Sequence, residues 1–324
     1  MKCYCCENEI ENSVEVCPFC KFEYPKKEGT AEEYEKIAMA KAVEYRQKNH
    51  IVPKSEAAGV NSEGNETVKK LQSNNQLFVA YCQYTNLPFV TCDEESFDDQ
   101  AHIFTTEDEI REYGKVQAEQ KMLILGMSYN RADFPRLYGL LYSIGVNSVV
   151  LHDNGTTTSV PIESIARRAD FSKLEENKRP LINESLQLSA IYFMQEMRKP
   201  GQEKTQERAQ MLREKEEELL ANFRRSEFLI PTLANPSDPK KVAIPFLKNK
   251  EGQTMQPICT DAIEVDKYQK MINKQKNPQK IRVLRVPFEK LPDLLIKEAH
   301  AFVFNPFGFN LPLTKEQIQK ILGR

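Results

Sequence analysis

Apolar residues along this chain fall into short runs and helical stripes that follow one another closely. Residues 77–82 (LFVAYC) and 121–128 (KMLILGMS) are short and mostly apolar, as buried strands are. In residues 132–145 (ADFPRLYGLLYSIG), apolar side chains recur every three or four positions, which is typical of one face of a helix. Because both patterns alternate within one stretch of chain, the sequence predicts an α+β fold.

The same pattern occurs twice. Residues 300–318 (HAFVFNPFGFNLPLTKEQI) align without a gap on residues 147–165 (NSVVLHDNGTTTSVPIESI), at an offset of 153. Both segments have three apolar strand residues, a turn ending in Gly155 or Gly308, and the start of a short helix. The polar residues between them differ. The repeat therefore predicts a duplication that keeps a packing frame rather than a set of reactive groups.

The predicted elements follow the same order in both copies. In the first copy, strands are expected at 77–82, 87–94, 102–106, 121–128 and 148–155, and helices at 107–115, 132–145 and 161–168. In the second copy, strands are expected at 227–233, 241–249, 255–260, 280–286 and 301–308, with helices after Asp261 and over 288–299. Thr106 with Glu109, and Asp261 with Glu264, have the spacing of capping boxes. Pro161 suits the first turn of a helix.

Helical segments lie between and before the copies. Residues 183–199 carry too many apolar side chains for a solvated spacer, so we expect them to pack on one of the two copies. Residues 203–225 are amphipathic and charged; a solvated face is the simpler interpretation, and partner binding is the alternative. The expected domains are a cysteine-rich module at 1–25, a helix and linker at 26–64, a first repeat domain at 65–168, a helical connector at 169–225 and a second repeat domain at 226–324.

Composition excludes several classes of protein. A chain of 324 residues suits two domains with smaller parts, and 40% hydrophobic residues with a net charge of −2 describe an ordinary globular protein. The start MKCYCCENEI lacks the apolar run of a signal peptide, and no stretch reaches the roughly 18 apolar residues of a membrane helix. These features predict a cytoplasmic protein that does not associate with membranes.

The strongest chemical signal is a cysteine cluster at the start of the chain. Cys3, Cys6, Cys17 and Cys20 form two C-x-x-C knuckles ten residues apart, a spacing that lets four thiolates converge on one tetrahedral zinc ion. A closed four-cysteine site has no position for water, so a bound Zn²⁺ is expected to be structural. Cys5 is a surplus thiol that could replace a neighbour or remain free. The module resembles the short zinc-ribbon family of bacterial proteins, although Glu7 and Lys21 stand where that family usually has glycine.

The repeat itself resembles the SseB-like proteins. Their domain has a strand, a threonine-containing step into a helix and an NP-x-G turn, and these features are found at 103–106, at 258–260 and at 305–308. The first copy departs at the turn, where it has His152-Asp153-Asn154-Gly155, and the second at Cys259, which replaces an aromatic residue. The resemblance covers most of 72–168 and 226–322. It implies a bacterial cytosolic interaction or regulatory module and implies no settled enzymatic activity.

Residues with catalytic potential are few. His152 and Asp153 with a thiol, Cys82 or Cys92, could act in acyl or thiol chemistry. The second copy has Asn305 and Pro306 at the positions of His152 and Asp153, so the fold does not need that pair. Phosphate-loop, HExxH, GxSxG and GxGxxG motifs are missing from the sequence. The sequence therefore predicts a protein that is not an enzyme and has no small-molecule substrate.

Charge differs between the copies and suggests an alternative partner. Residues 65–170 carry nine basic and fifteen acidic side chains, whereas 226–324 carry sixteen basic and ten acidic. Seven basic residues fall within 267–285, which makes this run the candidate contact for nucleic acid. Stacking aromatics are nearly missing from it, and a solvated surface is the simpler interpretation. The prediction is a non-enzymatic, protein-binding or regulatory module with a structural zinc site; a nucleic-acid-associated zinc-ribbon protein is the alternative.

Overall fold

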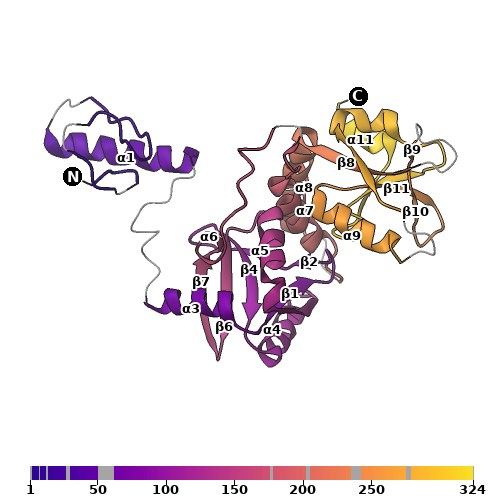
Figure 1. The fold of residues 1–324 in the computed structure, drawn as a ribbon, viewed down its shortest axis with the longest axis horizontal. Helices are drawn as coiled ribbons and strands as arrows, with labels where there is room; N and C mark the ends of the chain where they lie inside the picture. The colour runs from indigo at the N-terminus through magenta and orange to yellow at the C-terminus, as the bar shows by residue number, and fades with distance from the viewer. Residues whose placement is uncertain are drawn as a thin grey trace. The chain divides into compact units, whose positions relative to one another are not determined.

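A computed structural model describes residues 2–6, 8–11, 14–26, 30–49, 62–175, 178–201, 205–234, 242–274 and 279–323. The chain divides into two compact units, Met1–Thr67 and Val68–Arg324, and the second unit holds both copies of the repeat. Most of the linker expected at 51–64 lies outside the described residues, and a helix already begins at Ser62. Helices and mixed sheets alternate along the chain, so the fold class is α+β, as predicted (Figure 1).

The first unit combines the cysteine-rich module with α1 (Ala31–Asn49), the helix that the sequence predicted. Two isolated bridges, Lys2 with Glu9 and Val16 with Glu23, hold the two knuckles. Ala42 of α1 is buried against this module, and the rings of Tyr45 and Phe22 lie 5.5 Å apart. The helix therefore supplies part of the apolar core that a module of this size cannot build alone.

In the first copy, a sheet is covered by helices on both faces. Leu77 and Val79 of β1 pack with α5, whereas Ala80 and Cys82 pack with Ile110 of α4, because alternate side chains of a strand point to opposite faces. The described residues form seven strands in this sheet: β1 (Gln76–Cys82), β2 (Leu87–Pro88), β3 (Val90–Cys92), β4 (Asp99–Phe104), β5 (Ile124–Asn130), β6 (Ser148–Asp153) and β7 (Thr156–Pro161). The helices are α3 (Ser62–Ser73), α4 (Glu107–Glu119), α5 (Phe134–Ser143) after the 3-10 turn η1 (Arg131–Asp133), and α6 (Ile162–Ile165).

The second copy repeats these elements. Its strands are β8 (Glu227–Ala234), β9 (Val242–Ala243), β10 (Leu247–Lys248), β11 (Thr254–Ile258), β12 (Arg282–Pro287), β13 (Ala301–Phe304) and β14 (Leu311–Leu313). Its helices are α9 (Ala262–Ile272), the 3-10 turn η3 (Phe288–Lys290), α10 (Leu291–Leu294) and α11 (Lys315–Ile321). α9 packs on one face of the strands through Tyr268, and α10 packs on the other through Leu291.

Strand pairing is the same in the two copies. β4 runs parallel to β6 and β11 runs parallel to β13, and each parallel pair continues into an antiparallel strand, β7 or β14. On the other side, β1 pairs with β5 and β8 pairs with β12, both antiparallel. The pair Phe78–Phe104 joins β1 to β4, and the bridge Leu229–Cys259 joins β8 to β11. This shared order agrees with the predicted duplication.

Several elements differ from the sequence prediction. The strands expected at 87–94 and 241–249 are each divided into two short strands, and the helix expected at 288–299 ends at Leu294. α3 was not expected, because its sequence SEGNETVKKLQS is largely polar, yet its Leu71 is fully buried. β7 was not expected either, because Val160 is the one fully buried side chain in its described stretch TTTSVP. Pro161 ends β7 and precedes α6 rather than lying in the first turn of that helix, and α6 spans four residues. Amphipathic patterns are weak where a segment buries few side chains.

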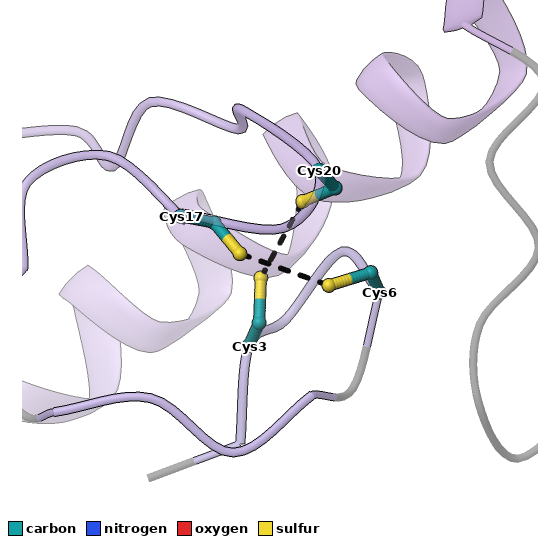
Figure 2. A group of neighbouring side chains, drawn as sticks. All are labelled: Cys3, Cys6, Cys17 and Cys20. Carbon is teal, nitrogen blue, oxygen red and sulfur yellow. Dashed lines mark hydrogen bonds between the residues drawn. The ribbon is translucent and has the colours of Figure 1, made fainter.

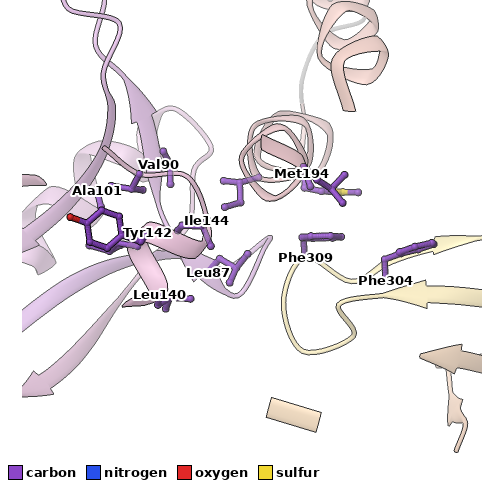
Figure 3. Close-up of a cluster of buried hydrophobic side chains, with 14 of the residues drawn as sticks. Leu87, Val90, Ala101, Leu140, Tyr142, Ile144, Met194, Phe304 and Phe309 are labelled. Atoms are coloured by element: carbon purple, nitrogen blue, oxygen red, sulfur yellow. The ribbon is translucent and has the colours of Figure 1, made fainter. Parts of the chain in front are cut away.

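The helix α7 (Glu184–Met197) contacts both copies, whereas we expected it to pack on one. Gln195 exchanges two hydrogen bonds with the backbone of Val90 in the first copy, at 2.9 and 3.3 Å. Asn183 donates to the carbonyl oxygens of Thr260 and Glu227 in the second copy, at 2.7 and 2.8 Å. Figure 3 shows Met194 beside Phe309 of the second copy, with Ile144 of the first copy on the other side of the helix. One hydrophobic core therefore continues through α7 from copy to copy.

The helix α8 (Gln206–Arg225) packs beside α7 and belongs to the core of the second copy (Figure 1). Phe223 is fully buried, and its ring meets that of Phe304 at 5.0 Å in an edge-to-face arrangement. Phe228 and Phe288 complete this aromatic cluster. The charged positions of α8 lie mostly exposed, as the sequence indicated.

Candidate metal centre

The side chains of Cys3, Cys6, Cys17 and Cys20 converge in the first unit (Figure 2). The sulfur atoms of Cys3 and Cys20 are 3.8 Å apart and those of Cys6 and Cys17 are 3.7 Å apart, while all four lie within 4.8 Å of one another. Four sulfurs around a tetrahedral Zn²⁺ at about 2.3 Å would be separated by about 3.8 Å. The donor set and its spacing thus fit a metal ion.

Tight backbone turns bring the two cysteines of each knuckle together. Cys3 donates its N–H to the carbonyl of Asn8 and Cys17 donates to the carbonyl of Phe22, both at 2.9 Å. Lys21 has a φ of 64°, in the left-handed region that glycine adopts without strain. Its N–H still reaches the carbonyl of Cys17 at 2.9 Å, so the lysine forms the turn at a cost in backbone strain. Glu7 lies outside the described residues.

Hydrogen bonds and burial act on the thiols in opposite directions. Burial opposes ionisation of Cys6, but N–H donors of Asn8, one of them the amide Nδ2 at 3.3 Å from the sulfur, lower its pKa to about 7. Burial raises the pKa of Cys17 and of Cys20. A cation held by the four sulfurs would offset this cost, because metal ligation requires thiolates.

Cys5 is buried but does not belong to the group of four. Within the described residues, that group contains Cys3, Cys6, Cys17 and Cys20, the same four that the C-x-x-C spacing predicted. The backbone N–H of Cys5 points to the sulfur of Cys3 at 3.4 Å, and its carbonyl accepts a hydrogen bond from Arg46 of α1. Cys5 therefore contributes its backbone to the first knuckle and its side chain to the small apolar core.

The structure does not bring His152 and Asp153 to either candidate thiol. The sulfur of Cys82 lies 3.6 Å from that of Met122. In the sheet register, Cys92 of β3 lies opposite Asp99 at the start of β4. His152 of β6 lies opposite Phe104 at the end of β4. Five residues of strand separate the two positions, which is about 16 Å. A nucleophile, base and acid are not assembled from these residues.

His152 instead meets a second histidine that the sequence pattern did not single out. Nε2 of His152 lies 3.1 Å from Nδ1 of His102, and Nε2 of His102 lies 2.8 Å from the hydroxyl of Thr91. The ring of His152 stacks on Phe104 at 4.3 Å. Burial lowers the pKa of His102 to about 3 and also lowers that of His152, so both rings are neutral near pH 7. Their shared face follows from the parallel pairing of β4 with β6, which local sequence patterns do not reveal.

The second copy has a buried amide and carboxyl network at the corresponding turn. Asn305 accepts the N–H of Thr260 at 2.9 Å and donates to Gln187 of α7 at 3.3 Å. Gln187 donates in turn to the carboxylate of Asp261, which also caps α9 by accepting the N–H of Glu264 at 3.0 Å. The turn itself was predicted, and Gly308 closes it with an N–H bond to the carbonyl of Asn305. Gln187 was not expected to take part.

Both copies place a carboxylate of the corresponding helix, α4 or α9, against the turn glycine. In the first copy, Glu109 accepts the N–H of Gly155 at 3.3 Å. In the second, Glu264 is 2% exposed, pairs with Lys267 at 2.6 Å, and approaches Gly308 so closely that a Cβ there would lie 3.1 Å from its oxygens. Burial raises the pKa of Glu264, and within the described part of the chain its Oε2 atom has no hydrogen-bond partner.

The basic run at 267–285 is partly neutralised. Lys267 pairs with Glu264, Lys270 with Asp266 at 2.7 Å, and Arg285 with Glu227. Lys276 lies outside the described residues. None of the helices in the described part of the chain has the length and apolar content needed to cross a bilayer.

Comparison with known proteins gives a family match over the second copy of the repeat. Residues 205–320 match the family model of the SseB protein N-terminal domain. The match runs from the start of α8 to α11, so it includes the helix that was expected to belong to the connector. No curated protein matches the chain. Among solved structures, Anabaena Tic22 (protein transport) is similar at 9% identity over 68% of this chain and 81% of that one, with a TM-score of 0.17.

Proposed function

We propose that this chain is a non-enzymatic protein-binding module with two SseB-type domains and a structural zinc ribbon. The observation that carries the proposal is the convergence of Cys3, Cys6, Cys17 and Cys20, with sulfur pairs 3.7 and 3.8 Å apart. Thiolate ligands favour Zn²⁺ over Mg²⁺ or Ca²⁺, which prefer oxygen. Four protein ligands complete a tetrahedral shell, so the metal would stabilise the ribbon rather than activate water.

The assignment of the first copy to the same domain type rests on shared geometry. Both copies have the same strand pairings, and in both a helix carboxylate, Glu109 or Glu264, lies at the turn glycine. Both also have a threonine, Thr105 or Thr260, in the step from the strand to this helix. The matching positions are ones that a folded turn needs, and this explains why the reactive groups between them can differ.

Exposed apolar side chains on the cysteine-rich module support the binding role. Phe19, between Cys17 and Cys20, is 62% exposed, and Val16 just before the knuckle is also exposed. A large aromatic ring at the tip of a metal-held turn is a rigid apolar anchor of the kind that interfaces favour. Residues 1–50 carry ten acidic and eight basic side chains, so a phosphate backbone is a poor match.

The non-enzymatic part of the proposal is supported by the environment of His152. Its ring is stacked on Phe104 and held by His102, and Asp153 is engaged by Lys70 at 2.7 Å and by Thr105 at 2.8 Å. These contacts stabilise the turn of the first copy. A general base needs an accessible lone pair near a nucleophile, and neither Cys82 nor Cys92 is close.

A capture experiment with the full chain tests the binding role. Proteins retained by the wild-type chain are compared with those retained by Phe19→Asp, which removes the exposed ring without changing a ligand. Phe97→Asp is the matched control, since Phe97 is 75% exposed in the first copy. We expect Phe19→Asp to lose a partner that Phe97→Asp retains, with equal zinc content in both. Identical partner sets for the two variants would reject the ribbon contact.

Nucleic-acid binding remains the second candidate because of the basic run at 267–285. The ion pairs of Lys267, Lys270 and Arg285 reduce its free positive charge. Retention on heparin or duplex DNA over a salt gradient tests it. Charge reversal of Lys270, Lys274, Lys276 and Lys280 should weaken retention if this run binds phosphate, and unchanged retention would rule it out.

A further inference from the structure

The strand β5 is an edge strand that lacks the usual protection. It pairs with β1 over seven residues, and within the described residues no strand covers its other edge. Its sequence ILGMSYN contains no charged residue and no proline, the two features with which native edge strands commonly block further pairing. Leu125 and Met127 are 46% and 45% exposed on one face of it. Such a strand is a template for another strand.

The equivalent strand of the second copy is protected. β12 contains Arg282 and Arg285 and ends at Pro287, and Arg285 is paired with Glu227. Charged side chains and a terminal proline hinder the approach of a further strand. The contrast shows that the fold does not require an uncharged edge at this position.

A groove continues from β5 along α4. It has a volume of about 400 Å³, and its lining includes Ile110 and Gly114 of α4 and Gly126 of β5. A Cβ on Gly126 would lie 3.2 Å from Ile110, so this glycine lets the helix pack tightly against the strand. Side chains from an added strand could therefore enter the groove beside α4.

The geometry points to a second copy of this chain as the occupant, with β5 pairing antiparallel to its own counterpart about a two-fold axis at Gly126. Gln83 donates to the carbonyl of Leu123, and Arg131 donates to the carbonyl of Asn75, both at 3.0 Å. The odd-numbered residues of β5 therefore direct their backbone groups to β1. Because the backbone groups of successive residues point to opposite edges of a strand, Ile124, Gly126 and Ser128 direct their N–H and C=O groups to the free edge.

That orientation makes β5 complementary to itself. About an axis at Gly126, the two glycines form a hydrogen-bonded pair, and Ile124 forms another with Ser128 of the second copy. Leu125 then lies opposite Met127 in a non-hydrogen-bonded pair, in which side chains approach most closely. Leu125 of each chain would cover Met127 of the other chain, so the contact occurs once on either side of the axis. Closed two-fold pairs are the commonest symmetric assembly.

The flanking helix favours the same partner. Glu107 and Arg111 line the groove one turn apart on α4, and their ion pair at 3.0 Å is exposed. When two such helices meet antiparallel across a two-fold axis, the acid of one faces the base of the other. A second copy would therefore place opposite charges along α4 and uncharged residues along β5. A strongly charged peptide would lack this match.

Sedimentation equilibrium of the full chain over a wide concentration range tests the pairing. We expect a reversible species of twice the 37.4 kDa chain mass. Met127→Lys should raise the dimer dissociation constant at least about tenfold, because the lysine is introduced at two symmetry-related positions. Val283→Lys is the control, since Val283 is 47% exposed on β12. A monomer at all concentrations, or equal weakening by Val283→Lys, would overturn the proposal.

Cross-linking tests the register without relying on a disruptive variant. In a Cys92→Ser background, which removes an exposed thiol, Leu125→Cys and Met127→Cys chains are mixed and oxidised. The antiparallel register places residue 125 opposite residue 127, so the mixed disulfide should exceed either homodimeric product severalfold. Equal amounts of the three products would contradict an axis at Gly126. Both results are independent of zinc and of the ribbon contact proposed above.

Discussion

The carboxylate of Glu264 lies against Gly308, close enough that a Cβ on the glycine would be 3.1 Å from both carboxylate oxygens. The repeat marks Gly308 as a turn residue, yet its backbone conformation is not the constraint, because its φ is not positive. The constraint is space for a buried carboxylate. The glycine is needed because a helix residue 44 positions earlier occupies the volume of its missing side chain.

Gly308→Ala should therefore destabilise the second copy. The glutamate must move or lose its contact with Lys267, and we expect a cost of about 1–3 kcal/mol in the free energy of unfolding, as for other overpacked sites. Gly139→Ala is the control, because a Cβ at this position of α5 meets nothing within 4 Å. Urea denaturation should show little loss or a small gain for the control. Equal destabilisation by both substitutions would contradict a steric role for the glutamate.

The histidine pair should make stability depend on pH. His102 is neutral in the folded chain, with a pKa lowered by burial to about 3, whereas an unfolded histidine has a pKa of about 6.5. Between these values the unfolded state binds more protons, so the stabilisation present above about pH 6.5 is lost as the pH falls toward 3. The steepest slope from one such group is about 1.4 kcal/mol per pH unit.

Replacing the buried ring isolates this contribution. In His102→Leu, the fall in unfolding free energy between pH 6.5 and pH 4.5 should be smaller than in the wild-type chain, when both are measured by urea denaturation at each pH. His300→Gln, at an exposed position, serves as the control for the loss of a histidine. The raised pKa values of Asp261 and Glu264 act in the opposite direction but are common to all three proteins. Parallel pH curves for His102→Leu and wild type would exclude the histidine as the cause.

Metal removal should unfold the first unit selectively. Elemental analysis is expected to find about one zinc per chain, reduced to near zero in Cys17→Ser, because the buried cluster of the small unit depends on its four sulfurs. Cys92→Ser, at an exposed thiol of the first copy, should retain the metal. Proteolysis of the zinc-free chain should cut within 1–67 and leave Val68–Arg324 resistant. Full zinc occupancy after changing all four cysteines to serine would refute the site.

The contact between Gln195 and Val90 should be among the most sensitive polar contacts of α7. Gln195→Met keeps the side-chain volume but leaves the buried N–H and carbonyl of Val90 without a partner. We expect a loss of about 2–4 kcal/mol in unfolding free energy, because two buried backbone groups lose their hydrogen bonds. Gln210→Met, at an exposed position of α8, should change stability little. A similar effect of both substitutions would show that the buried bonds contribute nothing.

Local patterns in the sequence predict most of the elements and the cysteine cluster. The C-x-x-C spacing selects Cys3, Cys6, Cys17 and Cys20 because neighbours in sequence share a tight turn, and such turns need few distant contacts. Strands such as β1 and helices such as α7 are predictable because each has a marked apolar pattern. Polar elements such as β7 and α3 are not, since each buries few side chains.

Tertiary structure decided which distant residues meet. The parallel pairing of β4 with β6 brings His102 to His152, fifty residues away, and separates His152 from Cys92. The position of α7 between the copies brings Gln187 to Asn305 and Asp261. The sequence by itself determined that the chain contains a duplicated packing frame and a four-cysteine cluster, because periodicity and spacing are local. It could not determine the polar contacts across α7 or the free edge of β5, because these depend on how separate segments pack in space.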